Sequence, residues 1–166
     1  TWSPKGKPTV IERNGSHKGI NIIGATEITK RFSFLYDTYP KGGQEDFRIC
    51  APQVIKFLER LRGYNQDLGI RKTFVILDNA RIHTAKAVKA YAREMKDEMI
   101  LIFLPPYSPE LNPQENIWCW LKSFLAQAMA YADVSALLAG IDTFQSRCIT
   151  AQAQVMRRVN ARSYYK

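Results

Sequence analysis

Two acidic residues stand where a β-sheet could hold a metal ion between them. Asp78 directly follows the apolar run Thr73–Leu77, and Glu115 falls in the first turn of an expected helix that opens at Asn112. The carboxyl ends of parallel strands lie along one edge of a sheet, which is where ligand sites gather in such folds. Carboxylate oxygens are the ligands that Mg²⁺ prefers. The pattern predicts two carboxylates that meet over a metal ion.

Each acid also has a plainer interpretation. Asp78 and Asn79 are common turn residues at the end of a strand. Asn112 and Glu115 match a capping box, with Asn at the N-cap and Glu at the third helical position. Such a cap contributes only about 0.5–2 kcal/mol. The proline-rich segment 105–109 fixes where this helix begins, which favours the metal interpretation for Glu115.

Residues around the first acid extend the possible site. His83 lies five positions after Asp78 and could orient a phosphate or a water, although a local hydrogen-bonding role is more common for such a histidine. Lys86, Lys89 and Arg93 fall on one face of the next expected helix. Such a face is usually only solvated, but in a basic chain it is also a plausible track for nucleic-acid phosphates.

The charge balance indicates the class of partner. The 166 residues carry a formal net charge of +9 and a pI near 9.6, which favours nucleic acid first and acidic membrane second over a basic but unspecialised surface. A basic arm at 1–18 contains Lys5 and Lys7. A basic C-terminal helix and tail at 150–166 contains Arg157 and Arg158, so all four are candidate contacts to nucleic acid.

Composition excludes several classes. The length fits one domain, 1–166, with a hydrophobic core.

Three separated cysteines without a CxxC pair indicate a reduced, intracellular protein, and the presence of only two histidines argues against a zinc site. No apolar run reaches the roughly 18 residues of a membrane span, and no signal peptide is recognisable. Since Thr1 is not Met, we expect the natural polypeptide to extend upstream.

Apolar periodicity predicts an α/β chain with parallel crossovers. Two segments are expected to form an antiparallel hairpin, and two wholly apolar segments are expected to form strands buried on both faces. Thr84 is expected to cap the helix after the first of these. The two tryptophans after Glu115 are expected in the core or on a partner surface rather than as base-stacking groups. The elements are strands at 8–12 (weak), 20–28, 31–36, 73–77 and 99–104, a loop at 39–43, and helices at 51–61, 85–95, 113–128, 134–148 and 150–159.

Two segments resemble the catalytic core of the IS630/Tc1/mariner superfamily of DDE transposases. They are FVILDNARIHTAK at 74–86 and LIFLPPYSPELNPQENIWCWLK at 101–122. The upstream TWSPKGKP and INIIGATE segments are similar to other parts of the same core, so the likeness covers most of 1–124. The resemblance implies an RNase H-like fold, with a mixed sheet flanked by helices.

The resemblance also implies an activity and a site. Asp78 matches the second acid of the family and Glu115 the third, with Asn79, His83 and Asn112 as supporting residues. The reaction is cleavage and strand transfer of double-stranded DNA, at transposon ends and target, with two Mg²⁺ or Mn²⁺ ions. Two such ions clamp the attacking and leaving oxygens of a phosphoryl displacement. A homodimer, possible strand exchange, a bacterial or archaeal host and a cytoplasmic, nucleoid-associated location are further expectations.

The chain departs from the family at its start. The family's first acid ends a strand just upstream of the segment that here contains Trp2, so that strand and its Asp are absent from this sequence. Glu12 and Asp37 do not match the motif. In the implied fold that strand lies mid-sheet, between the strands that end near Ile28 and at Leu77. Its burial contributes about 5–9 kcal/mol, against about 5–15 kcal/mol for a whole domain.

The missing strand predicts two bare sheet edges and three ways to cover them. The natural chain continues upstream, a second chain donates a strand, or the segment 1–12 folds into the gap. We expect no cleavage by this chain alone, because one metal-binding acid is missing. The alternative function is a non-catalytic remnant that binds DNA or self-associates. A nuclease of RNase H-like fold that acts on other nucleic acids is a third hypothesis.

Overall fold

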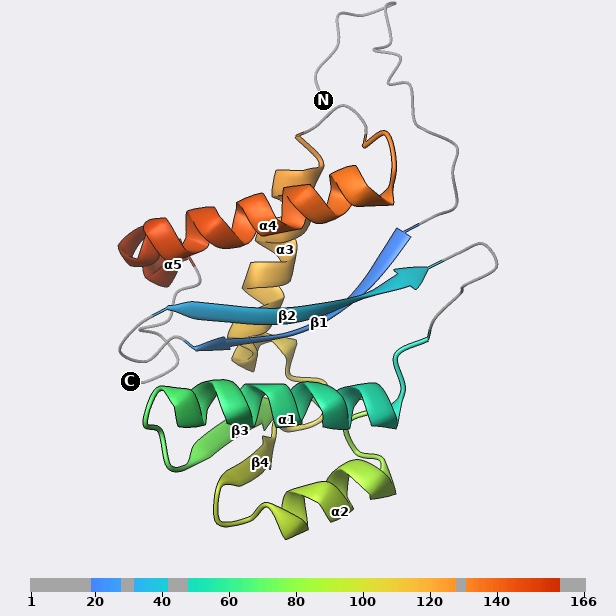
Figure 1. The fold of residues 1–166 in the computed structure, drawn as a ribbon, viewed down its shortest axis with the longest axis vertical. Helices are drawn as coiled ribbons and strands as arrows, with labels where there is room; N and C mark the ends of the chain where they lie inside the picture. Colours follow the sequence, from blue (N-terminus) through green and yellow to red (C-terminus); the bar gives the residue numbers. More distant parts are fainter. Residues whose placement is uncertain (1–18, 28–31, 42–47, 128–130, 159–166) are drawn as a thin grey trace, which may run out of the picture.

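A computed structural model describes residues 19–27, 32–41, 48–127 and 131–158. Figure 1 shows a long β-hairpin with helices above and below it. A second pair of short strands lies in the lower part of the view. The elements in order are β1 (Gly19–Glu27), β2 (Ser33–Lys41), α1 (Ala51–Asp67), β3 (Thr73–Leu77), α2 (Lys86–Glu94), β4 (Met99–Phe103), the 3₁₀ turn η1 (Pro109–Leu111), α3 (Pro113–Leu125), α4 (Val134–Thr150) and α5 (Gln152–Arg158).

The predicted antiparallel hairpin is confirmed, but its second strand is longer than expected. β1 and β2 pair along their whole length, from Gly19 opposite Lys41 to Glu27 opposite Ser33. The expected loop at 39–43 is therefore wrong for residues 39–41. Pro40 is tolerated because β2 has no strand on its outer side among the described residues, so its missing N–H costs no ladder bond there.

Helix α1 also exceeds its predicted range of 51–61. It passes through Gly63 and ends at Asp67, just before Gly69 adopts a φ of +75°. This left-handed conformation costs glycine little, so Gly69 is the residue that turns the chain out of the helix. At the other end, the side chain of Gln53 accepts a hydrogen bond from the backbone N–H of Cys50 at 3.1 Å.

Strands β3 and β4 pair in parallel, with Phe74 opposite Ile100 and Ile76 opposite Ile102. The prediction that both faces are buried is wrong. Val75 packs against α1 and α2, but Phe74, Ile76 and Ile102 on the other face are 61%, 52% and 44% exposed. Apolar composition alone did not distinguish the two faces, because covering elements come from elsewhere in the chain.

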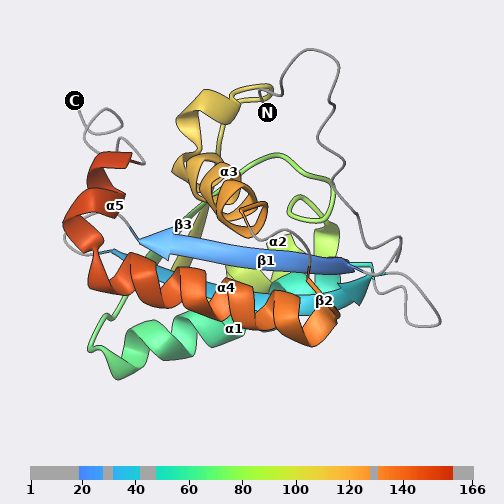
Figure 2. The same ribbon diagram turned by 90° about the horizontal axis from the view of Figure 1, so that it is seen from above.

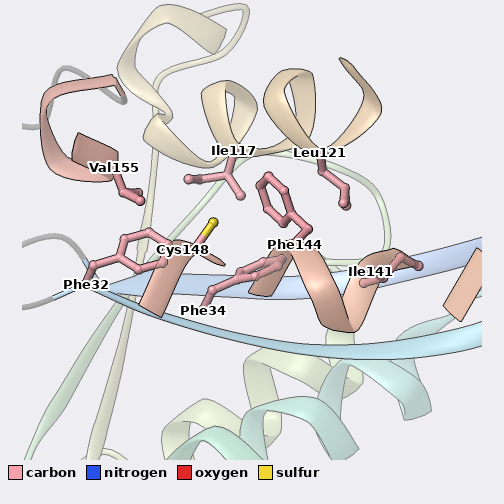
Figure 3. Close-up of a cluster of buried hydrophobic side chains, with 8 residues drawn as sticks. All are labelled: Phe32, Phe34, Ile117, Leu121, Ile141, Phe144, Cys148 and Val155. Carbon is pink, nitrogen blue, oxygen red and sulfur yellow. The ribbon is translucent and has the colours of Figure 1, made fainter. Parts of the chain in front are cut away.

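Two hydrophobic clusters hold the described chain together. The first joins the hairpin to α3, α4 and α5, and Phe144 and Cys148 of α4 lie at its centre with no exposed surface (Figure 3). The second joins β3 and β4 to α1 and α2. Trp118 and Trp120 pack against the first cluster, which confirms the expected core role. The predicted C-terminal helices correspond to α4 and α5.

The described strands form two separate two-stranded sheets, β1 with β2 and β3 with β4. Within the described ranges no ladder joins β1 to β3, so one edge of each strand is unpaired. The bare edges lie on the two strands between which the sequence predicts a missing strand. The weak strand at 8–12, the arm with Lys5 and Lys7, and the tail after Arg158 lie outside the described residues.

Candidate active site

Asp78 lies at the end of β3 with one carboxylate oxygen already engaged. Its Oδ1 accepts a hydrogen bond from the backbone N–H of Ala80 at 3.0 Å and lies 2.7 Å from Nδ1 of His83. The side chain of Asp78 remains 49% exposed, while that of His83 is only 19% exposed. The turn interpretation and the site interpretation are thus compatible, since Oδ1 holds the turn while no hydrogen bond to Oδ2 is found in the described chain.

Asn79 ties the ends of the two parallel strands together. Its side-chain Nδ2 donates to the carbonyl oxygen of Leu104, and the N–H of Leu104 donates to the carbonyl of Leu77 at 2.8 Å. The first residues after β3 and β4 are therefore fixed relative to each other. Asn79 thus helps to fix the turn that carries Asp78, while its supporting role at a site stays a prediction.

Thr84 does not cap α2 as predicted. The N-cap is Ala85, without a side-chain bond, and the hydroxyl of Thr84 instead donates to the carbonyl of Ala80 at 3.3 Å. The helix begins one residue later than predicted, so Thr84 precedes the N-cap position and its hydroxyl bonds within the turn that carries His83.

Asn112 caps α3 as predicted, but the capping box does not form. Oδ1 of Asn112 accepts the N–H of Gln114 at 3.2 Å, and only the backbone N–H of Glu115 points back to Asn112. The carboxylate of Glu115 is exposed and has no hydrogen bond or ion pair within the described chain. This leaves its oxygens available to a ligand, which favours the metal interpretation over the cap.

Sequence reasoning missed Gln114. The hydroxyl of Thr26 in β1 donates to Oε1 of Gln114 over 2.5 Å, while Nε2 of Gln114 is buried without a partner in the described chain. The available signal was that Gln114 falls on the apolar stripe of α3 with Ile117 and Leu121. A polar residue on such a stripe needs a partner, since burial of an unbonded amide is costly.

The candidate phosphate-binding residues are exposed where the structure describes them. Lys86, Lys89 and Arg93 lie along α2, and Nζ of Lys89 is 5.8 Å from the centre of the Phe103 ring at the end of β4. This contact brings one cation of the face to the strand end that precedes the proline-rich loop. Arg157 is exposed on α5, and the side chain of Arg158 lies outside the described residues.

The donor atoms suit a hard divalent cation in type but fall short in number. Asp78 and Glu115 provide the carboxylate oxygens that Mg²⁺ prefers. No group of three His, Cys, Asp or Glu side chains able to hold a metal occurs in the described part of the chain. The described residues therefore offer two carboxylates of suitable type but no complete metal centre.

The mixed α/β architecture, with helices that flank small sheets, is that of an RNase H-like domain. The chain belongs to the DDE superfamily endonuclease family, whose profile matches residues 1–138. The resemblance to DDE transposases is thus confirmed, while membership of the IS630 branch stays a prediction.

Two individual proteins illustrate the likeness. The solved "Structure of Mos1 transposase catalytic domain and Raltegravir with Mg" has a TM-score of 0.51 with this chain at 16% identity, covering 90% of this chain and 84% of the other. This likeness confirms the RNase H-like fold. The uncharacterized protein y4pE/y4sA of Sinorhizobium fredii (strain NBRC 101917 / NGR234) is 44% identical over 48 residues, 29% of this chain and 32% of that protein. The match thus spans about a third of that relative's length.

No helix in the described residues is both long and apolar enough to cross a bilayer.

Proposed function

We propose that this chain is part of the catalytic domain of a transposase that cleaves double-stranded DNA and transfers strands with Mg²⁺ or Mn²⁺. The observation that carries the proposal is a pair of solvent-accessible carboxylates in metal-binding positions of the family motif, Asp78 directly after β3 and Glu115 in the first turn of α3. Family membership over residues 1–138 supports the reaction class.

Each residue of the pair has a distinct part. Asp78 and Glu115 hold the metal, which when bound polarises the scissile phosphate. His83 and Asn79 orient Asp78 through the turn that follows β3. Asn112 fixes where α3 begins and thereby where Glu115 lies. The basic face of Lys86, Lys89 and Arg93 holds the DNA backbone.

We further propose that this chain does not complete the reaction alone, because it contributes two of the three acids. The test is a cleavage assay with Mg²⁺ or Mn²⁺ on DNA that carries the element's terminal repeats. We expect no cleavage above background. Robust cleavage that both Asp78→Ala and Glu115→Ala abolish would contradict the claim of inactivity.

Metal binding tests the pair without requiring catalysis. Tb³⁺ prefers oxygen ligands, and Trp118 lies one helical turn after Glu115, close enough to sensitise Tb³⁺ luminescence. We expect Asp78→Asn and Glu115→Gln each to weaken the signal. The matched controls Asp67→Asn and Glu94→Gln change exposed acids at helix ends and should not. Equal titrations for all variants would refute the metal site.

A second function has its own support. Phe74, Ile76 and Ile102 form an exposed apolar face on β3 and β4, next to a strand edge that has no partner among the described residues. Such a surface is suited to association. We propose self-association through these strands, including strand exchange in a homodimer, as the alternative role.

A further inference from the structure

A contact between β1 and α3 holds the residue next to Glu115. The hydroxyl of Thr26 donates a hydrogen bond over 2.5 Å to Oε1 of Gln114, which directly precedes Glu115. The backbone N–H of Gln114 is bonded to Oδ1 of Asn112 at 3.2 Å. Gln114 is thus held through both its side chain and its backbone, so the start of α3 has little freedom to shift along β1.

A second contact lies one helical turn further along. A Cβ added to Gly24 would lie 2.8 Å from Cη2 of Trp118, so the indole sits directly against the strand backbone. Thr26 and Gly24 are two residues apart on one face of β1, about 6.6–6.8 Å. Gln114 and Trp118 are four residues apart in α3, about 6 Å. α3 therefore touches β1 at two points, at Thr26 and at Gly24.

Two contact points fix both the axial position and the rotation of a helix. Figure 2 shows α3 on the side of the hairpin away from α1. Gln114 and Trp118 face β1, while Glu115 lies about 100° further round the helix and is exposed. A slip or rotation of α3 would therefore move the Glu115 carboxylate relative to Asp78.

The buried amide of Gln114 is a further indication that this contact does more than stabilise the fold. Nε2 of its amide is buried with no hydrogen-bond partner in the described chain. An unsatisfied buried donor lowers stability, and an apolar side chain on this stripe would avoid that loss. Residues that break such a local rule are expected at functional sites, where precise placement is worth more than stability.

We infer that Thr26 and Gln114 are positioning residues for the Glu115 carboxylate, acting by locking α3 to β1. The inference rests on the proposed role of Glu115 as a metal ligand. By this inference the end of β1 contributes to the site, although this strand carries neither Asp78 nor Glu115.

A distance measurement tests the lock without any metal. One nitroxide label is placed on the native Cys119 of α3, which is exposed, and the other on Arg81→Cys, in the turn that follows Asp78. The exposed Cys50 is changed to Ser so that it does not react. Cys148 is fully buried and does not take up the label. We expect a single narrow distance distribution by pulsed electron paramagnetic resonance.

The variants remove the hydroxyl or the amide. Thr26→Val and Gln114→Leu should each broaden the distribution or move its mean by about 1.5 Å, one residue's rise along the helix. Thr26→Ser keeps the hydroxyl and should restore the native distribution. Thr143→Val removes a comparable hydroxyl that bonds only within α4, so it should change nothing. Native distributions in both test variants would overturn the inference, and if Gln114→Leu does not fold, Thr26→Val decides alone.

Tb³⁺ titration separates the inference from the function on which it rests. Thr26→Val and Gln114→Leu should weaken Tb³⁺ binding about 10-fold, as loss of outer contacts does at metal sites. Unchanged distances together with Glu115-dependent Tb³⁺ binding would overturn the inference and leave the proposed function standing. Changed distances without any Glu115-dependent binding would refute the metal site and keep the positioning of the helix.

Discussion

The imidazole Nδ1 of His83 lies 2.7 Å from Oδ1 of Asp78, the same oxygen that accepts the N–H of Ala80. One carboxylate oxygen is therefore held from two directions by the turn that follows β3. The orientation of Asp78 therefore depends on a residue five positions away in the sequence.

Removal of the imidazole should loosen this carboxylate. We expect His83→Ala to weaken Tb³⁺ binding about 10-fold, the lower end of the range for lost outer contacts at metal sites. His83→Asn can place an amide donor near the position of Nδ1 and should retain more of the affinity. Titration by luminescence checks both variants, and equal affinity for His83→Ala and the native chain would show that the contact is incidental.

The basic face of α2 should control the salt dependence of DNA binding. Each phosphate contact contributes about 0.9 to the slope of log K against log salt on duplex DNA. Changing Lys86, Lys89 and Arg93 together to Gln should lower this slope by about 2–3, measured by fluorescence anisotropy. An unchanged slope would show that these three side chains are only solvated and do not contact phosphates. The matched control carries the same change at three other exposed basic residues, Lys56, Arg71 and Lys72.

The exposed strand face should make the chain associate. Ile76 on β3 is 52% exposed, and Ile149 on α4 is 50% exposed, so the two offer similar apolar surface in different settings. We expect Ile76→Lys to shift the sedimentation velocity profile toward monomer, because it places charge beside an unpaired strand edge. Ile149→Lys should leave the profile unchanged. Equal shifts would indicate general surface stickiness rather than a strand-face contact.

Two glycines should respond in opposite ways to alanine. At Gly24 an added Cβ would lie 2.8 Å from Trp118 and 3.1 Å from Phe34, so Gly24→Ala should cost about 1–3 kcal/mol through overpacking. Gly63 lies inside α1 with open space around it, so Gly63→Ala should stabilise by about 0.5–1 kcal/mol. Urea unfolding measures both free energies. A mild effect at Gly24 would mean that α3 moves away from β1 at little cost.

Burial raises the pKa of the Cys148 thiol from 9.0 to about 12. The unfolded chain therefore loses this proton at lower pH than the folded chain. The resulting stability is fully present below pH 9.0 and is lost as pH rises toward about 12. We expect Cys148→Ala to flatten the fall in unfolding free energy above pH 9.0 by at most about 1.4 kcal/mol per pH unit. Parallel profiles in urea titrations would contradict this.

Thiol labelling gives a direct control for that prediction. Cys50 and Cys119 are exposed, while Cys148 has no exposed surface. In the folded chain we expect two thiols to react quickly with a chromogenic disulfide and the third to react only on unfolding. Rapid reaction of all three would show that the first cluster opens readily.

Periodicity and turn chemistry predicted most of the element order, because the strand at Thr73–Leu77 and the start of α3 at Asn112 carry local signals. The extension of β2 to Lys41 was missed because its pairing with Gly19 is non-local. The exposed face of β3 was missed because an apolar run does not record what covers it. The pair Asp78 and Glu115 was predicted from motif and position, and its role and geometry remain predictions.

The contacts around the pair were less predictable. The Thr26–Gln114 hydrogen bond joins residues 88 positions apart, and neither local sequence contains a pattern that predicts it. The expected capping box failed because Asn112 bonds to the N–H of Gln114 instead of sharing a reciprocal pair with Glu115. In both cases a polar side chain has several possible hydrogen-bond partners, and the folded arrangement determines which one it bonds.

The division into two hydrophobic clusters has a consequence for how the chain opens. Side chains of β1 alternate between them, with Ile22 packed against the first and Ile23 against the second. No backbone ladder in the described chain links the two halves, so each can lose its protection against amide hydrogen exchange separately. Thermal unfolding would then follow two overlapping transitions instead of a single cooperative one. The amides of β3 and β4, on the half with the open apolar face, would exchange first.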